Sequence, residues 1–487
     1  MTKRGLASFV ATAAVLIARV AGAQPQYTAP TDAPQWLKDR RYNEGIGIRA
    51  GDLEVHPGIA GEVGYDSNWF SRSTDTGVAN GPPAAPVVPS FVVRITPSLY
   101  LSTISQQRRE GDLVAASPAT VFRAGVNATY RALFGLSSDA SQKSNDPSQG
   151  NTVSGAADMR LDILPERPFG GDIFGSFTRV VQPNTASADP NVSFTRDDIR
   201  VGAELAIQPG AGTLDWRFGY DFDDLLFEYS AGVPFDTMTH EAFTRGRWRF
   251  RPRTSLVYDA SLRFISYAND QQALSLAGLV SSTPVRARIG MNGLVTDRFA
   301  ALAIVGWGAT FLDTSQLPLQ KQYDSVIGQA ELKWFLAASP GIANATELGL
   351  ALSSIAVGYV RDFQLSYIGN YYGTDRGYLK FSYFFAGRAL TTLEGGVGAI
   401  EYPTILNPPG AVGPAVRHDA FTDTRADATL FSEYRFTDAF GINTTLRYSQ
   451  NFSKAQILPI GSPLGSTTLY AMSWQRFEAY LGLRFFM

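Results

Sequence analysis

The sequence contains no cysteine and only three histidines, and it has no long apolar run after its first 20 residues. The lack of cysteine excludes a disulfide framework and a thiolate metal site. The longest later apolar stretch, residues 299–312, is interrupted by glycines and flanked by charged residues. It falls short of the roughly 18 apolar residues that a membrane-spanning helix needs, so a helical membrane protein is excluded.

Enzyme signatures are also missing from the sequence. It has no Gly-x-Ser-x-Gly turn, no HExxH motif and no phosphate-binding loop. His56, His240 and His418 are far apart along the chain, and the acidic run at 221–224 lacks the glycine and the closing glutamate of a calcium loop. We therefore expect a protein that is not an enzyme and that holds no cofactor and no metal ion.

The N-terminus has the three parts of a secretory signal peptide. A basic start at Lys3 and Arg4 precedes an apolar core at residues 6–18, and small residues at 21–23 form a cleavage site. The apolar core is too short for the alternative, a transmembrane anchor. We therefore predict a signal peptide at residues 1–23.

The chain beyond this signal peptide carries little net charge. Without Lys3, Arg4 and Arg19, it has 39 basic and 44 acidic side chains, a net charge of −5. That balance is not typical of nucleic-acid binding, so no nucleic-acid partner is expected. The aromatic content of 12% and the 46 glycines favour β-strands over helices.

The last 13 residues, from Gln475 to Met487, alternate strictly between apolar and polar side chains. Side chains alternate faces along a strand, so this segment predicts a strand with one apolar and one charged face. An outer-membrane barrel needs such a strand at its end, because the final strand pairs with the first and closes the sheet. The apolar face consists of Phe477, Ala479, Leu481, Leu483, Phe485 and Met487, and the other of Arg476, Glu478, Tyr480, Gly482 and Arg484.

The same alternation recurs through the chain in stretches of about ten residues, the length that crosses a bilayer as a tilted strand. Short turns alternate with long polar loops, which is the outer-membrane pattern. About 24 residues per strand and connection give 18 strands, an even number that leaves both termini in the periplasm. The long loops are expected near residues 70–90, 137–150, 182–195, 225–238, 267–283, 312–322, 362–376, 402–421 and 451–471.

We therefore predict an all-β fold, a transmembrane antiparallel up-and-down β-barrel of about 18 strands. The barrel is expected over residues 52–487, after a periplasmic N-terminal segment at residues 24–51. A large soluble β-sandwich or propeller would also show alternation, because one face of each strand is buried. Aromatic residues near strand ends, such as Tyr65, Trp69 and Trp474, and a charged inner face favour the membrane. The predicted location is the cell outer membrane, with its lipid around the barrel.

The sharpest polar pattern lies on the predicted eighth strand, where Arg245, Arg247, Arg249 and Arg251 share one parity. An arginine that faces lipid at the midplane costs about 2–4 kcal/mol, so we expect this row to face the lumen. It is either a cationic ladder that guides anionic or hydroxyl-rich solutes, or part of a salt-bridge network with neighbouring strands. The other candidate lumen residues are Asp215, Asp221, Asp223, Asp259, Arg286 and Arg288.

The first predicted strand contains Pro57 and ends in Tyr65-Asp66-Ser67-Asn68. It resembles the opening strand of the β-barrel porin 2 family, which often contains a proline and ends in a Tyr-Asp-x-Asn run. Residues 357–363 (VGYVRDF) are similar to later strands of that family. The family includes outer-membrane barrels encoded with polysaccharide secretion systems, notably in myxobacteria. One departure from the wider outer-membrane pattern is Met487 at the end, where an aromatic residue is usual.

The resemblance implies export of a polysaccharide across the outer membrane, either an exopolysaccharide or a spore-coat or surfactant polysaccharide. It also implies a periplasmic polysaccharide-export protein as partner. The alternative is a general or anion-preferring diffusion porin, which the arginine row motivates. A non-transporting surface or assembly-platform barrel is a third class, and an outer-membrane enzyme is the last.

Overall fold

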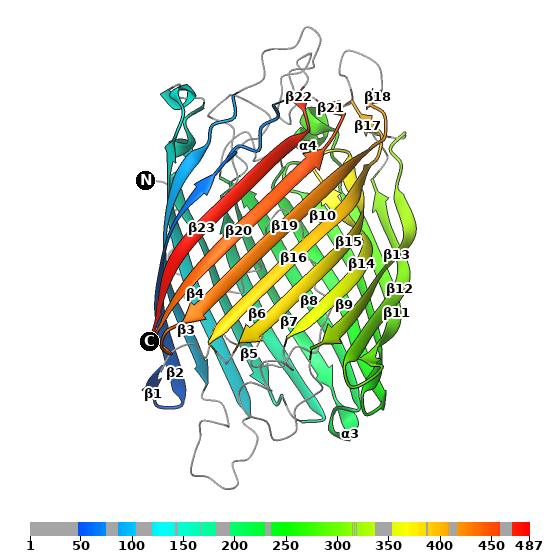
Figure 1. Cartoon of the computed structure of the whole chain (residues 1–487). Helices are drawn as coiled ribbons and strands as arrows, with labels where there is room; N and C mark the ends of the chain where they lie inside the picture. Colours follow the sequence, from blue (N-terminus) through cyan, green and yellow to red (C-terminus); the bar gives the residue numbers. More distant parts are fainter. Residues whose placement is uncertain are drawn as a thin grey trace, which may run out of the picture.

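The computed structural model of the chain shows one closed antiparallel barrel of 18 strands (Figure 1). The predicted signal peptide and most of the predicted periplasmic segment lie outside the described residues. The structure describes residues 47–487 except 75–85, 104–118, 142–144, 166, 182–194, 229–234, 314, 316, 318, 337–352, 386–387, 408, 410–415 and 458–469.

The strands follow one another around the wall in chain order, and each pairs with the next. This order confirms the predicted all-β, up-and-down barrel. The wall consists of β2 (Leu53–Asp66), β3 (Ser90–Thr103), β4 (Thr120–Gly135), β5 (Thr152–Ile163), β6 (Phe169–Val180), β7 (Arg196–Ile207), β8 (Leu214–Phe227), β9 (Thr237–Arg251), β10 (Thr254–Tyr267), β11 (Ser282–Leu294), β12 (Phe299–Leu312), β13 (Tyr323–Phe335), β14 (Ser354–Ser366), β15 (Asn370–Phe385), β16 (Ala389–Tyr402), β19 (Phe421–Arg435), β20 (Phe440–Phe452) and β23 (Trp474–Phe486).

Short elements occupy the two ends of the barrel. At the periplasmic end, β1 (Ile48–Ala50) folds back on the start of β2, and α3 (Pro209–Gly212) joins β7 to β8. Among the described residues, no helix is long and apolar enough to cross a membrane. The connections at the other end contain α4 (Asp270–Ala277), the 3-10 turns at Ser138–Ser141 and Pro147–Gly150, and the short strands β17 (Ile405–Leu406), β18 (Val416–His418), β21 (Gln456–Ile457) and β22 (Tyr470–Ala471).

One predicted loop is wrong. Residues 362–376 were expected to form a long loop, but β14 runs to Ser366 and β15 begins at Asn370. The connection is only three residues long, and both Gly369 and Asn370 have a positive φ, of 76° and 73°. Glycine and asparagine reach this left-handed region at low cost, which makes the tight turn possible.

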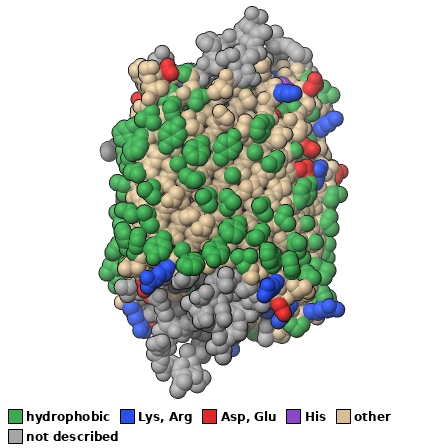
Figure 2. Space-filling view, in the orientation of Figure 1, with side chains coloured by type: hydrophobic (Ala, Val, Ile, Leu, Met, Phe, Trp, Pro, Cys, Tyr) green, Lys and Arg blue, Asp and Glu red, His purple; other side chains and the backbone are tan. Residues whose placement is uncertain are grey.

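The alternation of side chains divides the wall into an apolar outside and a polar inside. Figure 2 shows apolar side chains spread over the outer surface, with most charged side chains near its two ends. Leu205 and Val397 are 68% and 60% exposed on this outside, whereas inward Glu204 is 2% exposed. In a bilayer every backbone polar group must be bonded within the protein, which a closed barrel achieves without an edge strand. The chain is therefore an outer-membrane β-barrel.

The barrel closes where β23 pairs with β2, from Gly58 opposite Phe486 to Asp66 opposite Glu478. Asp66, which is fully buried, accepts hydrogen bonds from Arg476 of β23 at 2.5 and 3.1 Å. Two residues later, Asn68 donates to the carbonyl of Gln475 at 2.9 Å. The Tyr-Asp-x-Asn run of the first strand thus holds the first strand against the last.

We expect the substitution Asp66→Asn to destabilise the barrel by about 3 kcal/mol, because it removes the closer of the two carboxylates that pair with Arg476, Asp66 and Glu478. Asp297→Asn is the control, because Asp297 pairs with Arg253 at an exposed turn, where such a pair contributes less than about 1 kcal/mol. Urea unfolding of the barrel in lipid vesicles measures both losses. Equal losses would show that Asp66 has no special part in closure.

Candidate functional site

The arginine row lies on β9, the eighth strand of the wall. It alternates with Trp248 and Phe250, which are 51% and 41% exposed on the outside, so the row takes the inward parity. The remaining candidates also take inward positions on β8, β10 and β11. The ten residues are Arg245, Arg247, Arg249 and Arg251 on β9, Asp215, Asp221 and Asp223 on β8, Asp259 on β10, and Arg286 and Arg288 on β11.

The first two arginines of the row belong to an ion-pair network. Arg245 lies 2.6 Å from Glu204 of β7, and Arg247 lies 4.0 Å from Asp215 of β8. Arg217 stands between them and donates to Glu204 and to Asp215, each at 2.8 Å. Because the buried Glu204 is shared by two arginines, its removal would leave Arg245 without its ion-pair partner and Arg217 with only Asp215 and Asp172 among the described residues.

The network continues along the wall toward β4. Arg217 lies 3.9 Å from Asp172 of β6, which accepts a hydrogen bond from Arg160 of β5 at 2.9 Å. Asp162 then joins Arg160 at 2.8 Å to Arg123 of β4 at 3.1 Å. Six neighbouring strands therefore carry one chain of alternating charges, which neutralises most of this wall.

The predicted aspartates do not all pair with the arginine row. Asp221 accepts a hydrogen bond from Arg200 of β7 at 2.6 Å, and Asp259 lies 2.8 Å from Arg288 of β11. Asp223 forms no ion pair with any residue that the structure describes. The register of neighbouring strands decides these partners, and the sequence pattern alone does not contain it.

The last two arginines of the row lie outside the ion-pair network and can interact with solutes. Arg249 and Arg251 are exposed and form no ion pair within the described part of the chain. They lie at the end of β9 that leads into the two-residue turn to β10, so they belong to the periplasmic rim. Two unpaired guanidinium groups therefore give this rim a local positive charge.

Arg286 is the candidate whose contacts differ most from those expected, because its partners lie on a distant strand. It is 6% exposed and reaches past two strands from β11 to β14, where its Nε donates to Asp362 at 3.1 Å. Its Nη2 donates to the backbone carbonyl of Phe363 at 2.5 Å, and its guanidinium lies 4.2 Å from the centre of the Phe363 ring. A side chain spans this distance only if the end of β14 leaves the wall and approaches the lumen.

The strand pairing shows how β14 and β15 leave the wall. Pairing between β13 and β14 ends at Gly328 opposite Arg361, and pairing between β15 and β16 begins at Gly373 opposite Glu401. Beyond these points β14 and β15 pair only with each other, as far as Ser366 opposite Asn370. We call residues 362–372 the hairpin tip.

The hairpin tip packs against residues from other parts of the mouth. The Phe363 ring stacks on Tyr323 with centroids 4.4 Å apart, and a Cβ at Gly308 would come within 2.7 Å of this ring. Residues of α4, the β12–β13 loop and β17 join the same packing. This mouth cluster consists of Leu274, Val280, Leu312, Leu317, Tyr323, Ile327, Phe363, Tyr371 and Leu406.

The tip also reaches the connection between β8 and β9. The Tyr367 ring lies 5.7 Å from that of Phe227 and 5.8 Å from that of Phe235. Burial raises the pKa of neighbouring Asp236, although the carboxylate accepts a hydrogen bond from the Phe227 backbone amide. Since β8 and β14 are six strands apart, this contact crosses the mouth of the barrel.

Two hydrogen bonds fix the tip to α4. Asn370, which is 1% exposed, accepts a hydrogen bond from the backbone of Val280 at 2.9 Å. Its Nδ2 donates to the carbonyl of Gly278 at 3.1 Å. One side chain thus satisfies the backbone at the end of α4 and holds two loops together.

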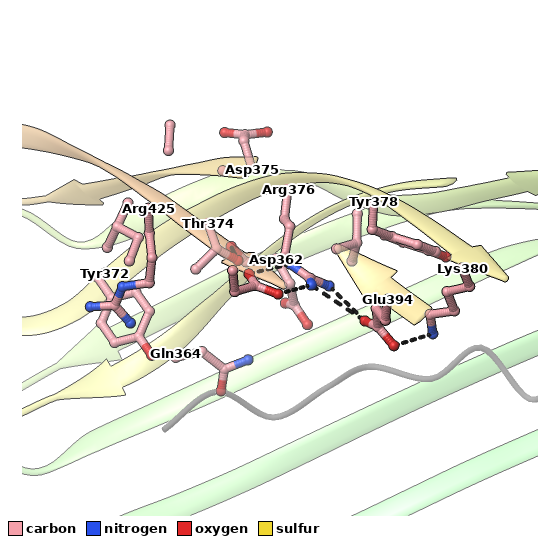
Figure 3. Close-up of a pocket in the computed structure, with 15 residues that line it drawn as sticks. Asp362, Gln364, Tyr372, Thr374, Asp375, Arg376, Tyr378, Lys380, Glu394 and Arg425 are labelled. Atoms are coloured by element: carbon pink, nitrogen blue, oxygen red, sulfur yellow. Dashed lines mark hydrogen bonds and ion pairs between the residues drawn. The ribbon is translucent and has the colours of Figure 1, made fainter. Parts of the chain in front are cut away.

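A recess opens on the inner wall between β14 and β19, below the mouth cluster. It encloses about 720 Å³, including the part open to solvent, and Figure 3 shows charged side chains on its surface. Arg376 donates to Asp427 at 2.6 Å and to Glu394 at 3.3 Å, and Lys380 lies 3.6 Å from Glu394. Arg425 lines the recess as well and forms no ion pair with a described residue.

Sequence reasoning missed the hairpin tip, the mouth cluster and the recess. The tip was hidden because its polar and glycine-containing sequence is typical of a loop. The dipeptide Gly369-Asn370 is a signal for a tight turn between two strands, and it was present in the sequence. In the described part of the chain no group of three or more His, Asp or Glu residues is arranged to hold a metal ion.

Solved structures with a similar arrangement include two Occ proteins and a ferric enterobactin receptor. Acinetobacter baumannii OccAB4 is 9% identical, with a TM-score of 0.41 over 90% of this chain and 99% of that one. Pseudomonas aeruginosa OccK1 (OpdK) is 10% identical, with a TM-score of 0.42 over 89% and 99%. The ferric enterobactin receptor PfeA of the same species is 10% identical, with a TM-score of 0.40 over 89% and 80%.

No family model and no curated protein matches the sequence. The resemblance to the β-barrel porin 2 family therefore stays a prediction. Identities near one in ten and TM-scores below 0.5 do not place the chain in the family of any solved structure. What the structure establishes is a closed outer-membrane barrel with a charged inner wall.

We expect Glu204→Gln to lower the free energy of unfolding by about 3 kcal/mol, because it removes a buried carboxylate that pairs with Arg217 and is the ion-pair partner of Arg245. The matched control is Arg249→Gln, which removes an exposed arginine without an ion pair and should change stability by less than about 0.5 kcal/mol. Chemical unfolding followed by tryptophan fluorescence gives both values. If the two substitutions had the same effect, the ion-pair network would not contribute to stability.

Proposed function

We propose that the chain is a diffusion porin that prefers anionic solutes. The observation that carries the proposal is the unequal pairing of charges along the lumen. The network around Glu204 neutralises the first two arginines of the β9 row, whereas Arg249 and Arg251 at the periplasmic rim keep their charge unpaired among the described residues. Unpaired cations on a pore wall raise the local concentration of anions.

The size and lining of the barrel support this proposal. A barrel of 16–18 strands is wide enough to leave an aqueous channel. Its inward positions carry charged and amide side chains, which suit water and small polar solutes. A third unpaired arginine, Arg425, lines the recess nearer to the other end of the lumen. An anion therefore meets an uncompensated guanidinium group on both sides of the neutral network.

Export of a polysaccharide with a periplasmic partner protein rests on the sequence resemblance alone. The hairpin tip and mouth cluster cross one side of the mouth, and this favours small solutes over a polymer chain. The porin proposal gives the unpaired arginines a role and requires no periplasmic partner protein.

We predict that the double substitution Arg249→Gln and Arg251→Gln reduces the preference for anions. The permeability ratio of chloride to potassium should be above one for the natural chain and fall about twofold toward one in the variant, since glutamine keeps the length but not the charge. The zero-current potential of the purified barrel in a planar bilayer, measured under a potassium chloride gradient, gives this ratio.

Arg253→Gln serves as the matched control, because Arg253 is exposed at the neighbouring turn and already paired with Asp297. It should leave the permeability ratio unchanged. A natural chain that conducts no current, or a double variant with the same ratio as the natural chain, would contradict the proposal.

A further inference from the structure

The hairpin tip suggests how the proposed channel selects its solutes by size. We propose that residues 362–372 form the constriction that sets the largest solute able to pass. This inference rests on the proposed porin function and adds the element that limits it. The tip is the described segment that leaves the wall, crosses part of the mouth and is held there at several points.

The distance that the tip spans follows from the geometry of the barrel. Strands lie about 4.8 Å apart and tilt by about 40°, so each takes about 6 Å of circumference, and 18 strands give a diameter of about 36 Å. Wall positions six strands apart are then about 30 Å from each other in a round barrel. Tyr367 nevertheless touches Phe227 and Phe235, so the connecting segments fill much of that distance.

The tip is a fixed part of the mouth. Its base is held by the bonds from Arg286 to Asp362 and to the Phe363 carbonyl. Its end is held by Asn370, which bonds to the backbone at Gly278 and Val280. Between these two anchors Phe363 is only 2% exposed. Such packing resists displacement by a passing solute, and this is what a size limit requires.

The position of the recess agrees with this constriction. Asp362, Gln364 and Tyr372 of the tip form part of its lining, together with residues of β16 and β19. The tip therefore shapes the lumen where the charged wall of Arg376 and Arg425 begins (Figure 3). A solute that passes the tip next contacts these side chains, so the constriction lies beside the charged part of the lumen.

Two variants test the constriction. In the first, an Asn-Gly turn replaces residues 363–373, so that Asp362 and Thr374 close a two-residue hairpin. In the second, Asn370→Gly keeps the positive φ but removes both anchoring hydrogen bonds. The matched control is Asn127→Gly on β4, which removes an inward asparagine far from the tip.

The measurements are single-channel conductance and the swelling of vesicles in neutral sugars of graded size, which separates size from charge. Without the tip, the conductance should rise at least about twofold, and larger sugars should enter. Asn370→Gly should give a smaller rise with more current noise, and Asn127→Gly none. The folded fraction of each variant is measured by its mobility in unheated gels, so that only closed barrels are compared.

The two proposals fail in different ways. If the natural chain conducts but the variants keep its conductance and size limit, the constriction is overturned and the porin function stands. If the natural chain is closed and removal of the tip opens it, the constriction is supported and free diffusion is overturned. If neither chain conducts, both proposals are overturned.

Discussion

The structure depends on one constraint, which is that no backbone polar group can remain unpaired inside a bilayer. It forces the sheet to close, so the first and last strands must find each other across more than 400 residues. The contact between Asp66 and Arg476 lies on this closing pair, beside the hydrogen bond from Asn68 to the Gln475 carbonyl. Closure in turn fixes which side of every strand faces lipid and which faces the lumen.

With the inner face fixed, charge becomes the second organising element. The inward side chains cannot be apolar throughout a wet lumen, nor can they carry one sign without repulsion. Glu204, shared by Arg217 and Arg245, shows the compromise, since one carboxylate neutralises arginines on two strands. Among the described residues, Arg249, Arg251 and Arg425 are left over from this pairing, as is Asp223, and the three arginines are the unpaired charges that favour an anion.

The barrel, its strand number and its inner parity were predictable because alternation is local and repeats in every strand. The alternation in the last strand alone, from Gln475 to Met487, already predicted a closed barrel. Partners across strands were not predictable, since register decides that Asp221 meets Arg200 and Asp259 meets Arg288. The hairpin tip was missed because departure from the wall depends on Arg286 and Asn370, whose partners lie up to 92 positions away.

The central claim is that the inward face of β9 lines an aqueous lumen that favours anions. Because the chain has no cysteine, single cysteines can be placed at positions 247 to 251 and treated with membrane-impermeant thiol reagents of either charge. The account predicts that cysteines at 247, 249 and 251 react, and faster with the anionic reagent, while those at 248 and 250 stay protected by lipid. Equal reaction on both faces, or faster reaction with the cationic reagent, would contradict it.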